Sequence, residues 1–162
     1  MPDGPRYEDD FYAWTQHQAE VLRAMPSADN RFDRDHVAEE IEDLGKSERD
    51  AVSSQIRRVL EHFLKLASSP ADRPCYGWMR SIAEARETLR DKLSPTLRRD
   101  ADARLSELYE DAREAAELAL HDHGEHDAAA ALPAACPYTL DQVLTRGWCP
   151  DPPSSTIKDP SR

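Results

Sequence analysis

Glycine, β-branched residues and aromatic residues are all scarce in this chain of 162 residues. Only five residues are Gly and 7% are aromatic. Because β-branched and aromatic residues are the ones enriched in strands, this composition argues against a β-sheet. The charged content of 33% beside 39% hydrophobic residues is typical of helices whose charged side chains coat narrow apolar stripes.

Long hydrophobic runs and paired cysteines are also missing. No apolar run approaches the roughly 20 residues that a membrane-spanning helix needs, so we expect a soluble chain. The three cysteines, Cys75, Cys136 and Cys149, are an odd number and match no zinc or redox spacing. With no secretory signal in view, the reducing cytoplasm is the expected compartment.

Positive charge is in deficit, with a formal net charge of −11. Binding to nucleic acids or anionic membranes depends on Lys and Arg that neutralise phosphates, so we expect no broad nucleic-acid surface and no membrane surface. Phosphate-binding loops, nucleophile elbows and zincin motifs are absent as well. The sequence therefore predicts no cofactor.

What the chain does have is apolar residues at three- and four-residue steps, the pattern of helices. Proline, glycine and capping residues divide this pattern into five expected helices, at about residues 8–25, 34–67, 78–93, 94–120 and 139–145. Their order predicts an all-α fold, an antiparallel four-helix bundle with a short fifth C-terminal helix. We expect one domain at 7–149, a flexible N-terminus at 1–6 and a disordered, Pro- and Ser-rich tail at 150–162.

The first two helices have clear apolar stripes. The inward face of the first is expected to hold Tyr7, Phe11, Trp14, Gln18, Val21, Leu22 and Met25. That of the second is expected to hold Val37, Ile41, Leu44, Val52, Ile56, Val59, Phe63 and Leu66. The second stripe keeps its period through Gly45, which predicts one long helix, although a break at Gly45 is the alternative.

Three polar residues fall inside the stripe of the second helix. Glu48, Gln55 and His62 follow one another at steps of seven, which separates neighbours by about 10 Å, too far for two of them to share a metal ion. Buried polar groups need partners, so each should bond to another helix, with Arg86 the first candidate for Glu48. Whether this ladder is structural or functional is open at this stage.

A second polar cluster closes the fourth expected helix. His121, His123 and His126 are weak candidates for binding a divalent metal, because imidazole suits nickel and zinc. Histidines at a helix C-terminus also complement the helix dipole, and we favour that interpretation. No Glu-x-x-His pair of the di-iron type occurs, so no metal site is expected.

Four segments together resemble a bacterial family called domain of unknown function 29. They are "YEDDFYAWTQHQAEVLR", "HVAEEIEDLGKSERDAVSSQIRRVLEHFLK", "GWMRSIAEARETL" and "CPYTLDQVLTRGWCPD". The resemblance implies a helical protein and names no reaction. The polar residues that lie in its matching motifs are Glu40, Glu48, Arg49, His62, Trp78 and Arg86.

Together with Gln55, these residues form our candidate site, a Glu-Arg-His group between the second and third helices. The alternative is a salt-bridge network that fixes helix register. For function we expect a cytoplasmic bacterial protein-interaction or regulatory module, binding an unknown protein partner or itself. The alternative is a metal-dependent enzyme with a carboxylate and histidine site between bundle helices.

Overall fold

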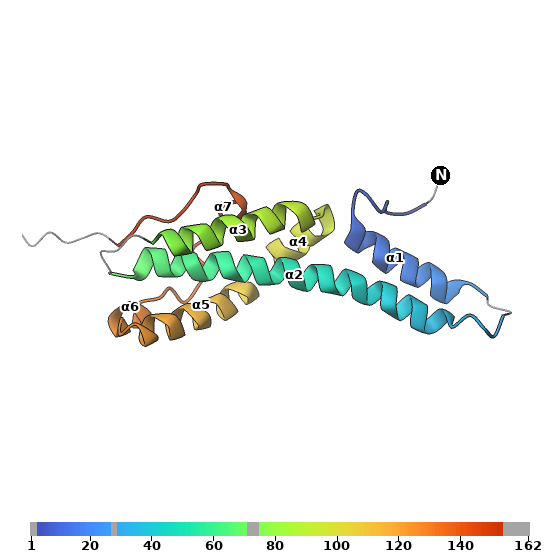
Figure 1. Ribbon diagram of the computed structural model, residues 1–162, viewed down its shortest axis with the longest axis horizontal. Helices are drawn as coiled ribbons and strands as arrows, with labels where there is room; N and C mark the ends of the chain where they lie inside the picture. Colours follow the sequence, from blue (N-terminus) through green and yellow to red (C-terminus); the bar gives the residue numbers. More distant parts are fainter. Residues whose placement is uncertain (1–2, 27–28, 71–74, 154–162) are drawn as a thin grey trace, which may run out of the picture. The chain divides into compact units, whose positions relative to one another are not determined.

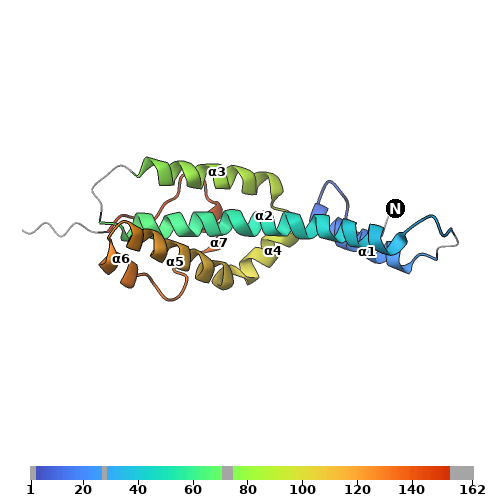
Figure 2. The same cartoon turned by 60° about the horizontal axis from the view of Figure 1, so that its bottom comes forward.

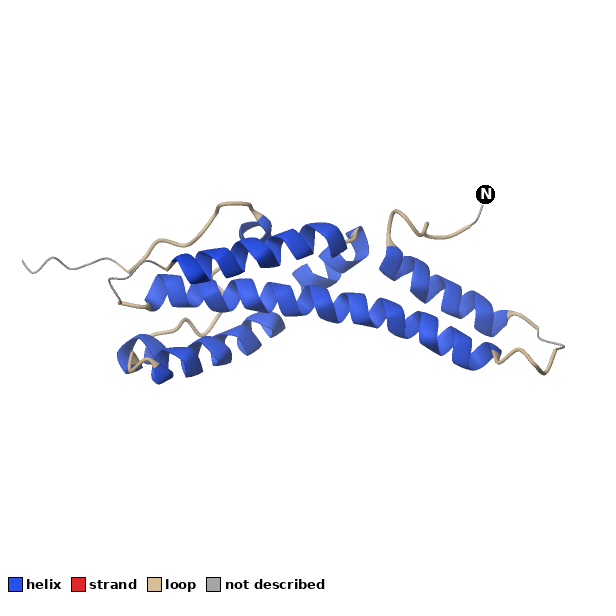
Figure 3. Ribbon diagram, viewed as in Figure 1, coloured by secondary structure: helices blue, strands red, loops and turns tan. Residues whose placement is uncertain are grey.

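The computed structural model describes residues 3–26, 29–70 and 75–153, and these residues form helices and connections without any strand (Figure 3). The all-α class is therefore confirmed for them. The helices are α1 (Phe11–Ala24), α2 (Arg34–Ser68), α3 (Tyr76–Lys92), α4 (Pro95–Ala103), α5 (Leu105–Asp122), α6 (His126–Ala130) and α7 (Leu140–Leu144). Within the described residues, no helix is both long and apolar enough to cross a membrane.

The described residues group into two compact units. The first comprises those up to Ser54 together with Arg90–Ala103, and the second comprises Gln55–Leu89 together with those from Arg104 onward. Helix α2 is continuous and contributes to both, so the predicted passage of this helix through Gly45 is confirmed. The single domain expected at 7–149 stays a prediction.

In the first unit, α1 and the N-terminal half of α2 form an antiparallel hairpin (Figure 1). The buried residues between them are small: Thr15 and Ala19 on α1, and Ala38 and Gly45 on α2. Small side chains let the two backbones approach closely. A Cβ on Gly45 would clash with Thr15 Oγ1 and lie 2.6 Å from Gln16 Nε2, so only glycine fits at this crossing.

The start of α1 is tied to α4. The Asp10 carboxylate caps α1 by accepting a hydrogen bond from the Ala13 N–H at 3.0 Å, and it also accepts one from the Thr96 N–H at 2.9 Å. Burial raises the pKa of Asp10, but these hydrogen bonds outweigh it and the pKa falls below its usual value. One carboxylate thus satisfies backbone donors at the starts of two helices.

The second unit has a conventional core of large apolar residues. Helix α3 lies antiparallel to the C-terminal half of α2, and α5 runs along the same half of α2 in the same direction as α2 (Figures 1 and 2). Its fully buried large side chains include Ile56, Leu60, Phe63, Leu64, Ile82, Leu89, Leu108 and Tyr109. The predicted core positions Ile56, Val59, Phe63, Ile82 and Leu89 are therefore confirmed as buried.

The single fourth helix expected over 94–120 was wrong. The chain forms α4 and α5 with a turn at Arg104, and the division between the two units falls at the same place. The apolar stripe is interrupted here because Leu97 and Ala101 serve the core of the first unit, while Leu108 and Tyr109 serve that of the second. The short helix α6 was not predicted.

The chain ends are partly confirmed. Thr139 and Gln142 form the predicted capping box of α7, with N–H to side-chain oxygen distances of 3.2 and 2.9 Å. Gly124 follows the end of α5 with φ of 75°, the left-handed conformation expected of a C-terminal stop. Of the expected flexible ends, residues 1–2 and 154–162 lie outside the described residues.

Candidate functional site

The polar residues singled out from the sequence do not meet in one group. Glu48 is paired with Lys92, whose Nζ lies 2.8 Å from Glu48 Oε1, and Glu40 is exposed on α2. The predicted partnership of Glu48 with Arg86 was wrong, because Arg86 binds backbone carbonyls of the C-terminal segment. Glu48 is also half-buried rather than in the core, so its ion pair contributes at most about 1 kcal/mol to stability.

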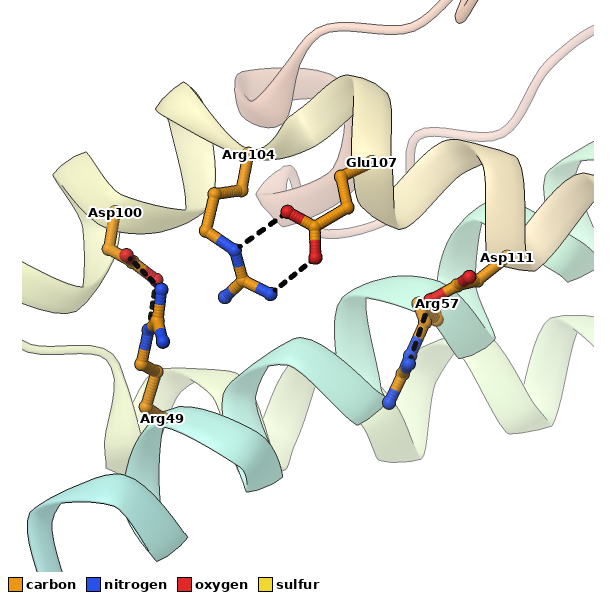
Figure 4. A network of polar contacts seen from close by, with 6 residues as sticks. All are labelled: Arg49, Arg57, Asp100, Arg104, Glu107 and Asp111. Carbon is orange, nitrogen blue, oxygen red and sulfur yellow. Dashed lines mark hydrogen bonds and ion pairs between the residues drawn. The ribbon is translucent and has the colours of Figure 1, made fainter.

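Arg49 is engaged by a carboxylate of its own unit. Its Nε and Nη2 donate to the two carboxylate oxygens of Asp100 on α4, at 2.9 and 2.8 Å (Figure 4). In the second unit, Arg57 donates to Asp111 on α5 at 2.9 Å. Both ion pairs join two helices. They therefore fit the alternative considered from the sequence, a salt-bridge network that fixes helix register.

Gln55 and His62 are the two members of the ladder whose hydrogen bonding is incomplete. His62 Nε2 lies 2.9 Å from Ser81 Oγ on α3, while His62 Nδ1 and Gln55 Oε1 are buried without a partner among the described residues. Near His62, the Lys65 ammonium lies over the ring of Trp78, 5.4 Å from its centroid. Burial, with a contribution from Lys65, lowers the pKa of His62 to about 4.

This depressed pKa makes His62 a source of pH-dependent stability. The unfolded chain takes up a proton near pH 6.5, whereas the folded chain resists until about pH 4. The neutral imidazole therefore favours folding above pH 6.5, and this contribution is lost as the pH falls toward 4. We expect the free energy of unfolding to fall by about 1–2 kcal/mol more in the wild-type chain than in His62→Gln over this range.

Urea denaturation at several pH values measures this difference directly. Gln keeps a side-chain hydrogen-bonding group near Ser81 but does not titrate, and the other histidines are common to both chains. Parallel pH profiles for the two chains would mean that His62 is not buried as a neutral group.

Arg86, in the second unit, makes three hydrogen bonds and is only 7% exposed. Its Nε donates to the Val143 carbonyl at 2.8 Å, and its Nη2 donates to the carbonyls of Gln142 and Trp148 at 3.0 and 2.8 Å. The guanidinium also lies over the Phe63 ring, 5.5 Å from its centroid. The last carbonyls of a helix lack intrahelical partners and carry partial negative charge, so Arg86 satisfies the end of α7 and holds it on α3.

The histidine cluster lies in the second unit, on α5, α6 and their connection. His121 Nδ1 and His126 Nδ1 are 2.8 Å apart, and His123 Nδ1 lies 2.7 Å from the Ala119 carbonyl near the end of α5. Contact with a terminal carbonyl is what the helix-dipole interpretation predicts for His123. In the part of the chain that the structure describes, no three His, Cys, Asp or Glu residues are arranged to hold a metal ion.

The largest departure from the expected side-chain arrangement is on the α1–α2 hairpin. Large apolar residues expected in the core are exposed there: Val21 is 38% exposed, Met25 52%, Val37 37% and Leu44 55%. Ile41 is half-buried, and Phe32, in the loop that joins the two helices, is 46% exposed. We call the surface formed by Val21, Met25, Val37, Ile41 and Leu44 the hairpin face.

These residues belong to one side of the hairpin. Val37 and Leu44 each precede a buried small residue, Ala38 or Gly45, by one position and are thus rotated about 100° from it around α2. On α1, Gln18 precedes buried Ala19 by one position and is rotated in the same sense. Val21 follows Gln18 by three positions and so lies on the same stripe as Gln18. Because the helices are antiparallel, rotations in the same sense bring both apolar stripes to the same side.

The hairpin face lies N-terminal to the point on α2 where Lys92 contacts Glu48. Helix α3 ends at Lys92, whose ammonium reaches Glu48, and α2 continues beyond that point toward Arg34. An open hollow of about 440 Å³, lined by residues that include Tyr7, Phe11, Glu48 and Leu93, adjoins this contact. Tyr7, which precedes α1, packs against Phe11 and Trp14, whereas Val21 and Met25 lie near the other end of the helix.

The faces predicted to be buried on α1 and on the first half of α2 were wrong. The prediction followed the large apolar residues, whereas the buried contact is made by Thr15, Ala19, Ala38 and Gly45. The signal that could have revealed this contact is the spacing of small residues, four apart on α1 and seven apart on α2, because small residues allow close helix packing.

A family model describes most of this chain. The model for the domain of unknown function DUF29 matches residues 6–149. The chain belongs to the DUF29 family. Sequence comparison with curated proteins gives no match.

The DUF29 chain also resembles a solved structure. A crystal structure of an α-helical protein of unknown function from Rhodospirillum rubrum shares 25% sequence identity with it, with a TM-score of 0.77. The similarity covers 90% of this chain and 93% of the other. Neither the family description nor this similar protein carries an assigned function, so the function of the DUF29 chain must be argued from its own residues.

Proposed function

We propose that this DUF29 protein is a protein-interaction or small regulatory module. The observation that carries the proposal is the bare hairpin face. Its four exposed members, which are 37–55% exposed, leave roughly 300 Å² of mostly apolar surface uncovered. The largest apolar patch on a monomeric protein is typically of this size and is often functional.

The polar residues support the same proposal, because most of them have structural partners. Glu48, Arg49 and Arg86 bind Lys92, Asp100 and the end of α7, and these contacts hold helices together. These contacts do not favour the alternative considered from the sequence, a metal-dependent enzyme.

We also propose that the module works in the bacterial cytoplasm and that the whole chain forms an antiparallel four-helix bundle. Cys136 and Cys149 form no disulfide within the described residues, which suits a reducing compartment. The antiparallel pairs α1–α2 and α2–α3 support an up-and-down order of helices.

Site-specific photocrosslinking tests the proposed function. A photoreactive amino acid is placed at Leu44, on the hairpin face, or at Leu118, which is 65% exposed on α5, in bacterial cells that naturally produce the chain. We expect a protein adduct at Leu44 that is absent at Leu118, whether the captured protein is the chain itself or another one. Equal labelling at both positions, or none at Leu44, would contradict an interaction through this surface.

A further inference from the structure

The hairpin face has the features of one half of a symmetric interface. Interfaces of standard size bury about 800 Å² on each partner, of which somewhat more than half, roughly 450 Å², is apolar. The exposed apolar area of the hairpin face, roughly 300 Å², is about two thirds of that share. The hairpin face can therefore supply most of the apolar core of one interface of standard size.

The charges around the hairpin face favour an uncharged occupant over a basic one. The chain carries a net charge of −11, so a basic partner would be expected to dock where carboxylates gather. The exposed carboxylates Glu39 and Asp43 instead lie about 140° and 100° around α2 from Leu44, and Glu42 is already paired with Arg23 and Lys46. On α2, Glu40 lies at the edge of the apolar stripe, and Glu48, at the end of the stripe, is neutralised by Lys92.

Two copies of this face could therefore meet without strong repulsion. Charged groups are depleted from the cores of protein interfaces, and the hairpin face meets that condition even though the chain as a whole is acidic. In a two-fold dimer each copy offers the same patch, so a patch that is apolar and almost uncharged complements itself.

We propose that the occupant of the hairpin face is a second copy of this chain, which forms a two-fold symmetric dimer. The inference rests on the proposed function and names the partner of the same surface. Pairing two hairpins through these faces makes an intermolecular four-helix bundle, with Val37, Ile41 and Leu44 of each copy in the shared core. The α1–α2 hairpin then obtains the large apolar contacts that its own small-residue interface lacks.

The mass of the purified full-length chain in solution tests this. Light scattering after size-exclusion chromatography, from about 1 to 100 µM, should give twice the monomer mass of 18.3 kDa. The double variant Val37→Glu with Leu44→Glu should be a monomer, its dimer dissociation constant raised by about 100-fold or more. Because both side chains are exposed in the folded chain, its circular dichroism spectrum should be unchanged.

A matched control separates the hairpin face from apolar surface in general. Leu118→Glu makes the same exchange on α5 and should leave the dimer intact. A dimer that survives the double variant would place the interface elsewhere and overturn the inference. A wild-type chain that is monomeric throughout would overturn it too, while an adduct to another protein at Leu44 in cells would still support the interaction module.

Discussion

Replacing Arg86 with Ala should lower the free energy of unfolding by about 3–5 kcal/mol. The change removes three hydrogen bonds and leaves the carbonyls of Gln142, Val143 and Trp148 without their donor. Each carbonyl that stays buried and unpaired costs about 1–3 kcal/mol, so the C-terminal segment should detach from α3 rather than keep all three. Urea denaturation followed by circular dichroism gives the loss of stability, and the fluorescence of Trp148, near Phe63, reports the detachment.

Two further variants identify the cause of that loss. Arg86→Lys keeps the charge but cannot direct two nitrogens at three carbonyls, so it should recover less than half of the lost stability. Arg80→Ala, on the exposed part of the same helix, should change the free energy of unfolding by less than about 0.5 kcal/mol. A small, equal effect for Arg86→Ala and Arg80→Ala would mean that α7 does not depend on the guanidinium.

Replacing Gly45 with Leu should cost about 3 kcal/mol. A Cβ at this position already clashes with Thr15 Oγ1 and lies 3.2 Å from Thr15 Cβ, so a full side chain must push α1 away from α2. Leu is a better helix former than Gly by nearly 1 kcal/mol, but this gain is smaller than the cost of separating the helices. The urea midpoint measures the loss of stability, and hydrogen exchange measures the loss of helicity near α1.

The helical glycine on α3 provides the matched control for Gly45. A Cβ on Gly77 would meet no atom within 4 Å, so Gly77→Ala should be neutral or stabilise by up to about 1 kcal/mol. Gly45→Ala should destabilise, and adding Thr15→Ala should recover at least about 1 kcal/mol of the loss, because it removes the clashing hydroxyl. Simple additivity of the two changes would show that Thr15 and Gly45 are not in contact.

Sequence periodicity was sufficient to place most of the helices. The start of α1 after Asp10, the continuity of α2 and the capping box of α7 all follow from local interactions between residues a few positions apart. Local signals do not determine how many cores a helical stripe serves. The turn at Arg104 was missed for this reason, since Leu97 and Leu108 contact different units.

The candidate polar site was harder to predict, because partners of buried charges are usually distant in sequence. Glu48 and Arg86 both lie near apolar stripes, and opposite charge made them plausible partners. In the fold Lys92 is closer to Glu48, and the end of α7 takes all three Arg86 hydrogen bonds. A backbone carbonyl leaves no mark on the amino-acid sequence, so this partner could be found only in three dimensions.

By itself the sequence determined the all-α class, most of the helix positions and, through its motifs, the family. Helix formation and capping depend on neighbours along the chain. The tertiary structure decided which helix faces are buried. Close packing of Ala19 and Ala38 with Thr15 and Gly45 turned Val21, Val37 and Leu44 toward the surface. Helix crossings are set by side-chain volume at the point of contact, and that point exists only once two distant segments have met.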